Sequence, residues 1–316
     1  MTDFQLQNKK TASVNKDVKI SILTSLYKSE NFLSSYFEAL SQLRGKDVIE
    51  VLLLHNEPNA KELEIIAANL QAFDFVRHII IEERESLYKT WNRGICLSKG
   101  EYITVWNVDD VRFPGSVLQQ AKTLDQNPEA AISYGDIYLS KEYGVHGNKR
   151  TNSPDNNEKK DFFHAYHITC FQMWRKIIHK EIGYYDEQFY CSADLDFQIR
   201  AAIHYPFVKT KDILGIYLEA QPHKISSTGP QSLENNIIHL RYGAYQRLNF
   251  SNLYLSKKKY QIKKQLFFNE WHIFAEKSQF GRMYKFRGLI IAFFNTLLLL
   301  TKTFIKKLIL YDNAKR

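Results

Sequence analysis

Cysteine is scarce in this sequence, and its few cysteines lack the spacing that a structural role requires. Cys96, Cys170 and Cys191 are odd in number, lie far apart and include no Cys-x-x-Cys pair. Such a set predicts neither a disulfide framework nor a zinc knuckle. We therefore expect the protein to work in a reducing compartment.

Long apolar runs are also missing. Residues 1–17, MTDFQLQNKKTASVNKD, are polar, whereas a secretory signal needs an apolar core, so we expect a polar tail and a body that stays in the cytoplasm. The most apolar stretch, residues 288–300, is interrupted by Asn295 and followed by Lys302. A membrane-spanning helix needs about 18–20 apolar residues without interruption. This stretch is too short, which favours a helix lying in the membrane interface.

Acidic residues are depleted in one part of the chain only. Residues 251–316 hold fourteen lysines and arginines against three acidic residues, while the net charge of the whole chain is +9, so the remainder carries −2. A composition of 44% apolar and 24% charged residues is that of a globular domain with an extension. The basic end predicts an anionic surface as its partner, either nucleic acid or a phospholipid leaflet.

The first third of the chain alternates between short apolar runs and amphipathic segments. The apolar runs predict four strands, at 18–26, 49–55, 76–82 and 101–107. The amphipathic segments predict three helices, at 29–45, 61–73 and 86–99. This alternation predicts an α/β fold with a mainly parallel sheet, right-handed crossovers and helices on both faces.

The alternation weakens in the second half. The pattern predicts a helix at 116–128, a strand at 130–140, a polar loop at 147–161, a helix at 173–189 broken at Gly183, and a helix at 194–205. From about residue 231 the chain is helical in pattern, basic and aromatic. We expect a helical C-terminal extension there.

An acidic turn follows the last strand of the first half. The segment VWNVDDVRFPGS places Asn107, Asp109 and Asp110 at the strand end, and Pro114 prevents further regular pairing. Open α/β sheets bind ligands at the carboxyl ends of their strands, and oxygen ligands suit Mg²⁺ or Mn²⁺ carrying a diphosphate. A solvated turn, in which Asp is common for local reasons, is the alternative.

Two segments carry a resemblance to a known family. KISILTSLYKSENFL at 19–33, followed by NRGICLSKGEYITVWNVDD at 92–110, resembles glycosyltransferase family 2. The resemblance extends over about residues 18–228. It implies a Rossmann-like GT-A catalytic domain at 18–230, with a nucleotide-binding half at 18–110 and an acceptor half at 111–230, before the extension at 231–316.

By this resemblance, donor-binding residues follow the first two strands. Thr24, Ser25 and Tyr27 correspond to positions that line the nucleotide pocket. Asn56 is a further candidate, although His55 and Asn56 stand where the family usually has an acidic pair that contacts the base. We therefore expect base recognition to depart from the family's pattern.

Further donor and metal positions lie along the next segments. The family's D-x-D motif is Asn107-Val108-Asp109 here, so the resemblance makes Asp109 the metal ligand for Mn²⁺ or Mg²⁺ and leaves Asn107 and Asp110 as supports. The lost carboxylate should weaken the affinity for the metal.

Four other side chains complete the expected donor side. Asn92 and Arg93 correspond to a helix facing the diphosphate, where Arg93 either neutralises it or is simply solvated. Asp136 follows the next strand as a donor-side candidate. His223, in PHKISSTG, corresponds to a mobile loop and would be a metal ligand or an exposed loop histidine.

Inversion at an anomeric carbon also needs a base opposite the leaving group. FYCSADLDFQIRAA, preceded by GYYDE at 183–187, resembles the family's base-bearing element and makes Asp194 the base, with Asp196 as a support. Asp194 could instead cap the following helix. Arg200, four residues after Asp196, has two interpretations: an ion pair with Asp196 or a part in the chemistry.

The extension has two interpretations. A basic amphipathic helix with Lys302, Lys306 and Lys307 facing lipid phosphates predicts peripheral attachment to the cytoplasmic face of a membrane. The same helix could pack against the catalytic domain or a second subunit in a homodimer. No nucleic-acid-binding module accompanies the basic aromatic stretch, so we expect no nucleic acid partner.

The leading hypothesis is an inverting transferase. It would move a sugar from a nucleotide-sugar donor, UDP-linked by preference, to a saccharide or lipid-linked acceptor in polysaccharide or lipopolysaccharide assembly. A catalytically silent scaffold with the same fold is the alternative, suggested by the residues at His55, Asn107 and Ala193. Nucleotidyl transfer ranks last, because no glycine-rich loop follows the first strand.

Overall fold

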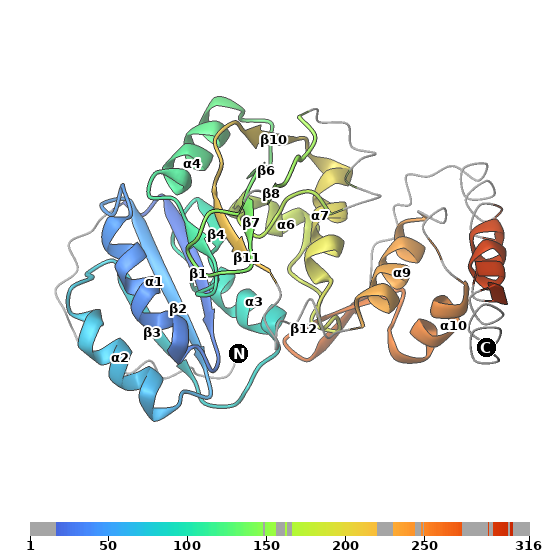
Figure 1. Cartoon of the computed structure of the whole chain (residues 1–316), viewed down its shortest axis with the longest axis horizontal. Helices are drawn as coiled ribbons and strands as arrows, with labels where there is room; N and C mark the ends of the chain where they lie inside the picture. Colours follow the sequence, from blue (N-terminus) through green and yellow to red (C-terminus); the bar gives the residue numbers. More distant parts are fainter. Residues whose placement is uncertain are drawn as a thin grey trace, which may run out of the picture.

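The computed structural model describes most of the chain, and Figure 1 shows it as a sheet flanked by helices with an extension to one side. The described residues are 17–147, 149–155, 162, 166–219, 230–243, 248, 250–273, 290, 293–302 and 304–305. His223, Lys306 and Lys307, which the sequence singled out, lie outside them.

A seven-stranded sheet forms the centre of the molecule. Its strands are β1 (Ile20–Leu26), β2 (Ile49–Asn56), β3 (Val76–Ile81), β4 (Tyr102–Val105), β6 (Ile132–Gly135), β9 (Met173–Arg175) and β10 (Phe207–Thr210). The spatial order is β10-β6-β9-β4-β1-β2-β3, and every pairing is parallel except the two that β9 makes. The prediction of a mainly parallel α/β sheet is confirmed.

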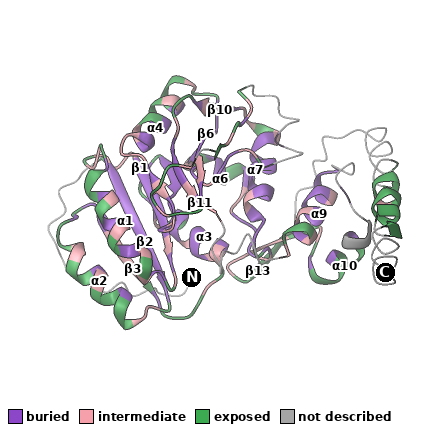
Figure 2. Ribbon diagram, in the orientation of Figure 1, coloured by how far each residue is buried: buried purple, intermediate pink, exposed green. Residues whose placement is uncertain are grey.

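Helices cover both faces of this sheet because its strands are apolar on both sides. In β2, Val51 and Leu53 pack into one core with α1 (Glu30–Gln42), α2 (Ala60–Leu70) and α4 (Ser116–Gln126). Leu52 and Leu54 point to the opposite face, toward α3 (Leu87–Leu97) and α7 (Ala193–His204). Figure 2 shows the strands at the centre of the sheet as mostly buried, and every residue of β2 is buried. This double coverage is typical of parallel sheets.

A smaller sheet lies beside the carboxyl end of β4. It has the order β5-β11-β7-β8, formed by β5 (Val111–Arg112), β11 (Gly215–Leu218), β7 (Tyr138–Ser140) and β8 (Lys149–Arg150). Since β5 begins directly after Asp110, this sheet holds the acidic turn in place.

The prediction of a helix over 173–189 was wrong at its start and also after Gly183, where residues 184–189 form no helix. Residues 173–175 form β9, followed by a 3₁₀ turn (Lys176–Ile178) and the short α6 (His179–Ile182), which ends at Gly183 with φ of +73°. Met173 and Trp174 are fully buried where β9 runs between β4 and β6. The predicted strand at 130–140 is divided into β6 and β7, and β10 and β11 were not predicted.

The extension packs against the catalytic body. It contains α9 (Gln231–Tyr242), α10 (Phe250–Lys259) and a hairpin of β12 (Lys264–Phe267) and β13 (Glu270–Ile273), which the sequence did not predict. Ile237 and Ile238 of α9 belong to the same buried cluster as α7. Part of the extension is therefore continuous with the core.

The last described residues, between 290 and 305, are helical and exposed, as Figure 2 shows. Their apolar side chains in contact with solvent are Ile290, Phe293, Phe294, Leu297, Leu298, Leu299, Leu300, Phe304 and Ile305. Within the part of the chain that the structure describes, no helix is both long and apolar enough to cross a membrane.

Candidate active site

The turn after β4 buries a side-chain oxygen to which no described residue donates a hydrogen bond. The backbone N–H of Asp110 donates to the carbonyl of Asn107 (3.1 Å), and the indole N–H of Trp106 donates to the carbonyl of Asp110 (2.9 Å), which closes the turn. The side-chain oxygen Oδ1 of Asn107 is buried and accepts no hydrogen bond from the described residues. Because such an atom is costly unless it is satisfied, it points to a ligand at this position.

The two aspartates of the turn differ in their surroundings. Asp110 is buried, and its Oδ1 accepts from the backbone N–H of Leu218 (3.2 Å), which joins the turn to β11. Asp109 is partly exposed. Burial, aided by the charges of Asp110 and Asp109, raises the pKa of the neighbouring Tyr143 to about 12. Asp109 is therefore the carboxylate that a ligand can reach.

The side chains after β1 form two different environments. Thr24 is fully buried, and its hydroxyl lies 2.6 Å from that of Tyr36, so this hydrogen bond joins the end of β1 to α1. Ser25 and Tyr27 are partly exposed. Arg84, which the sequence did not single out, lies 3.9 Å from the centre of the Tyr27 ring and donates to its hydroxyl (2.9 Å). This exposed arginine brings a positive charge to the strand ends.

Asn56, at the end of β2, forms hydrogen bonds with other residues of the protein. The carboxamide of Asn56 donates to Thr90 (2.8 Å) and accepts from the backbone N–H of Glu85 (2.9 Å). These contacts leave Asn56 anchored in the protein.

The other polar residue at this strand end is also held inside the protein. His55 lies between His78 (Nδ1 to Nε2, 3.0 Å) and Glu62 (Nε2 to Oε2, 3.2 Å). Burial and the neighbouring His55 lower the pKa of His78 to about 4. A buried polar cluster therefore occupies the place at which the family usually has its acidic pair.

Asn92 and Arg93 of α3 are also engaged. The Asn92 carboxamide is fully buried, donates to the carbonyl of Tyr185 and to Glu187 (both 2.9 Å), and accepts from the N–H of Tyr185. Arg93 forms a two-point ion pair with Glu85, which raises the arginine pKa. Asn92 thus fastens α3 to the 183–187 segment, and the charge of Arg93 is matched within the protein.

Asp136 lies in a further ion pair. Its Oδ2 lies 3.1 Å from the ammonium of Lys209, and its Oδ1 accepts from the backbone N–H of Ser153 (2.9 Å). It holds the segment after β8 against β10.

Asp194 occupies the first turn of α7. Its Oδ1 accepts from the N–H of Leu195 (2.8 Å) and from the hydroxyl of Tyr88 (3.4 Å). Burial raises its pKa to about 6, although hydrogen bonds from Leu195, Tyr166 and Tyr88 oppose this. A carboxyl group with such a pKa is ionised at neutral pH and still basic enough to accept a proton. The expected alternative, Asp194 as the cap of a helix that starts after it, was wrong, because α7 begins at Ala193 with Ser192 at the N-cap position.

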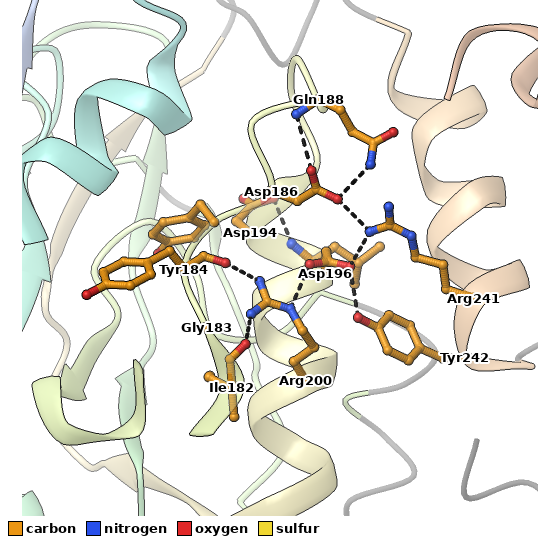
Figure 3. A network of polar contacts seen from close by, with 12 residues as sticks. Ile182, Gly183, Tyr184, Asp186, Gln188, Asp194, Asp196, Arg200, Arg241 and Tyr242 are labelled. Atoms are coloured by element: carbon orange, nitrogen blue, oxygen red, sulfur yellow. Dashed lines mark hydrogen bonds and ion pairs between the residues drawn. The ribbon is translucent and has the colours of Figure 1, made fainter. Parts of the chain in front are cut away.

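Beneath Asp194, a buried network joins α7 to the extension (Figure 3). Asp196 accepts from Arg200 (2.8 Å) and from Arg241 of α9 (3.0 Å), which also forms an ion pair with Asp186 (2.8 Å). The two arginines lower the pKa of Asp196 despite its burial. Since two cations face two carboxylates, the network is neutral.

The described residues contain no group of three or more His, Cys, Asp or Glu side chains arranged to hold a metal ion. Asn107 and Asp109 are the candidates for cation ligands. Both supply oxygen, which is the atom that Mn²⁺ and Mg²⁺ prefer.

Comparisons with known proteins agree with this architecture. A glycosyltransferase of Methanocaldococcus jannaschii that is itself uncharacterized is 27% identical over 187 residues, which are 57% of this chain and 63% of that protein. Residues 1–349 of S. aureus TarS, in complex with UDP-GlcNAc, match with a TM-score of 0.58 at 15% identity, over 71% of this chain and 66% of that one.

A third similar protein is the mannosyltransferase PcManGT from Pyrobaculum calidifontis, solved with GDP-Man and Mn²⁺. It has a TM-score of 0.50 at 11% identity, over 74% of this chain and 66% of that one. The chain thus spans just under two thirds of the length of each of these three proteins. The structural matches establish the GT-A fold.

The family model for glycosyl transferase family 2 matches residues 21–183, which include nearly all of β1, the turn after β4 and Asn92 of α3. This match covers more than half of the chain. The chain therefore belongs to glycosyl transferase family 2.

Proposed function

We propose that this protein transfers a sugar from a nucleotide-sugar donor to an acceptor hydroxyl with inversion. The observation that carries the proposal is the setting of Asp194, a partly exposed carboxylate whose pKa is raised to about 6 at the rim of a pocket. Membership of the family supports the reaction class. The strand-end turn with Asn107 and Asp109 supplies the donor side.

The chemistry follows from the two groups. Asp194 accepts the proton of the acceptor hydroxyl while that oxygen forms a bond to the anomeric carbon. The bond from the anomeric carbon to the diphosphate oxygen breaks on the opposite face, and the nucleoside diphosphate leaves. Tyr88 and Leu195, which already donate to Asp194, orient its carboxylate for this role.

A divalent cation fits the donor side. The unsatisfied Oδ1 of Asn107 and the reachable carboxylate of Asp109 would hold Mn²⁺ or Mg²⁺ together with oxygens of the donor diphosphate. When bound, the cation would stabilise the negative charge of the leaving diphosphate. A single carboxylate predicts weak binding of metal in the absence of nucleotide. The Mn²⁺ and GDP-Man bound by PcManGT support this proposal by analogy.

The setting of the reaction is part of the same proposal. The basic, apolar helix near residues 290–305 would lie on the cytoplasmic face of a membrane, where anionic lipids attract Lys302 and its neighbours. A saccharide or lipid-linked acceptor in polysaccharide or lipopolysaccharide assembly suits this location. We favour a UDP-linked donor, which the UDP-GlcNAc complex of TarS supports only by likeness of fold.

Release of nucleoside diphosphate tests the proposal. Purified protein is incubated with a panel of UDP- and GDP-sugars, with and without Mn²⁺ and acceptor extract. We expect release from one donor, its suppression by chelation, and its loss in Asp194→Asn but not in Asp212→Asn, which alters an exposed aspartate outside the site. Absence of release from every donor would refute the proposal.

A scaffold protein without catalytic activity is the second candidate. It is favoured by Asn107, a carboxamide where the metal motif usually has a carboxylate, and by Asn56, whose side chain hydrogen-bonds to Thr90 and Glu85. It predicts nucleotide binding without turnover. Thermal stabilisation by UDP or GDP that is the same in wild type and Asp194→Asn, with no product from either, would select it.

A further inference from the structure

A small pocket opens between the start of α7 and the α9 helix of the extension. Its volume is about 110 Å³, and its lining residues are Tyr166, Ser192, Asp194, Leu195, Gln231, Asn235 and His239. The three residues from α9 are spaced by four, so they form one stripe along that helix. The proposed base Asp194 therefore faces a wall supplied by the extension.

The chemistry of this wall suits uncharged hydroxyl groups. Gln231 is exposed and Asn235 partly exposed, and neither side chain makes a hydrogen bond recorded with the described residues. Each carboxamide offers two N–H donors and one oxygen acceptor, which matches groups that both donate and accept. Among the described residues, no lysine or arginine lines the pocket, and Asp194 would repel an anion. A phosphate or carboxylate is thus disfavoured here.

Two buried contacts fix the distance between the walls. Glu234 of α9 accepts from the backbone N–H groups of Tyr190 (2.6 Å) and Cys191 (2.9 Å), just before α7, and from the Tyr260 hydroxyl (2.8 Å). The second contact is the ion pair of Arg241 with Asp196. The pocket is therefore built from two helices locked together, and its shape is set before any ligand binds.

We propose that this pocket is the acceptor subsite and that Gln231 and Asn235 recognise an uncharged sugar through its hydroxyl groups. The inference rests on the proposed function, since it gives Asp194 its substrate. The family match ends at residue 183, so these specificity residues belong to this chain's own extension. Residues of α9 would then determine which acceptor binds, and residues at the ends of the strands would determine which donor binds.

Ligand-observed NMR on the full chain tests the subsite without needing turnover. The probes are methyl glycosides of neutral hexoses and N-acetylhexosamines, with methyl glucuronide and glucose 6-phosphate as charged counterparts. We expect at least one neutral glycoside to bind and the charged sugars to bind more weakly. Asn235→Ala and Gln231→Ala should each weaken glycoside binding about tenfold, the effect of losing about 1.4 kcal/mol of hydrogen bonding.

Ser232→Ala is the matched control, because Ser232 is exposed on the same helix but does not line the pocket. It should leave glycoside binding unchanged. Three results would overturn the proposal: no binding of any neutral glycoside to the wild type, binding to both α9 variants that equals binding to the wild type, or preference for the charged sugars.

A donor measurement separates this proposal from the broader one. Thermal stabilisation by UDP or GDP with Mn²⁺ reports the strand-end site and should be the same in wild type, Asn235→Ala and Gln231→Ala. Glycoside binding that fails while nucleotide binding and product release persist refutes the subsite alone. Nucleotide binding and release that fail while glycosides bind through Asn235 refute the transferase proposal instead.

Discussion

Replacing Asp194 with Asn should abolish catalysis while making the protein more stable at neutral pH. The folded state raises the pKa of this carboxyl from 3.8 to about 6. Because one pKa unit corresponds to 1.36 kcal/mol, ionised Asp194 destabilises the fold by up to about 3 kcal/mol at neutral pH. Asparagine has nearly the same shape but no charge to bury. The hydrogen bond from the Leu195 N–H can be kept by its oxygen.

The sign of the pH dependence follows from the raised pKa. The folded state binds the proton more tightly than the unfolded state, so the contribution of Asp194 to stability falls as the pH rises from about 4 to about 6. It is constant above that range. The stabilising effect of Asp194→Asn should therefore be largest above pH 6 and disappear near pH 4.

The pH dependence of activity should reflect the ionisation of the Asp194 carboxyl group. In the wild type, kcat/KM should fall about tenfold for each pH unit below about 6, since only the ionised form accepts a proton. The loss of a general base typically lowers the rate by about 10²–10⁴-fold. We expect Asp194→Asn to fall in this range without change in donor binding.

Two assays check these values. Urea unfolding of wild type and Asp194→Asn at pH 4 and pH 7.5 measures the stability difference, and nucleoside diphosphate release across the same range measures activity. Asp212→Asn is the control and should change neither. A variant that is less stable than the wild type at pH 7.5, or that keeps most of its activity, would refute the assignment of Asp194 as a base with a raised pKa.

Three further changes probe other parts of the structure. Arg241→Ala should lower the free energy of unfolding in urea by about 3–5 kcal/mol, because two buried carboxylates lose their shared cation; a loss of under about 1 kcal/mol, typical of surface ion pairs, would contradict this. Asn107→Asp should lower the Mn²⁺ concentration needed for UDP to raise the melting temperature, and an unchanged requirement would argue against a cation there. Gly100→Ala places a Cβ 2.6 Å from the backbone nitrogen of Ser21 and should cost about 1–3 kcal/mol by calorimetry, whereas Gly115→Ala, whose nearest atom is 4.0 Å away, should cost much less.

The sequence predicted those elements whose local pattern matches their environment. Strands β1 to β4 are short apolar runs and α1 to α3 are amphipathic, so periodicity alone located them to within a few residues. Met173–Arg175 was misassigned because a three-residue strand carries no period of its own. What makes it a strand is the gap between β4 and β6, which is distant in sequence.

Some residues of the candidate site could be predicted from the local sequence, and others depend on partners that are distant in the sequence. The turn at Asn107 and Asp109 could be predicted because strand ends of a parallel sheet converge at one edge. Arg84 could not, since its role depends on Tyr27, and Glu234 could not, since its backbone partners Tyr190 and Cys191 precede it by more than forty residues. Asn92 was expected at the diphosphate, yet it binds backbone groups of the 183–187 segment. An Asn within a helix gives no sequence signal that distinguishes these two uses.

The helix α7 explains why its two aspartates have opposite properties. Residues two apart on a helix do not share a face, so Asp194 and Asp196 enter different surroundings although one turn holds both. Asp196 meets two arginines, and its pKa is lowered. Asp194 meets tyrosines and a pocket, and its pKa is raised. Environments that separate the pKa values of neighbouring carboxyls identify the one suited to proton transfer. Because Arg241 comes from the extension, α9 supplies one of the two charges that keep Asp196 ionised as well as the wall that faces Asp194.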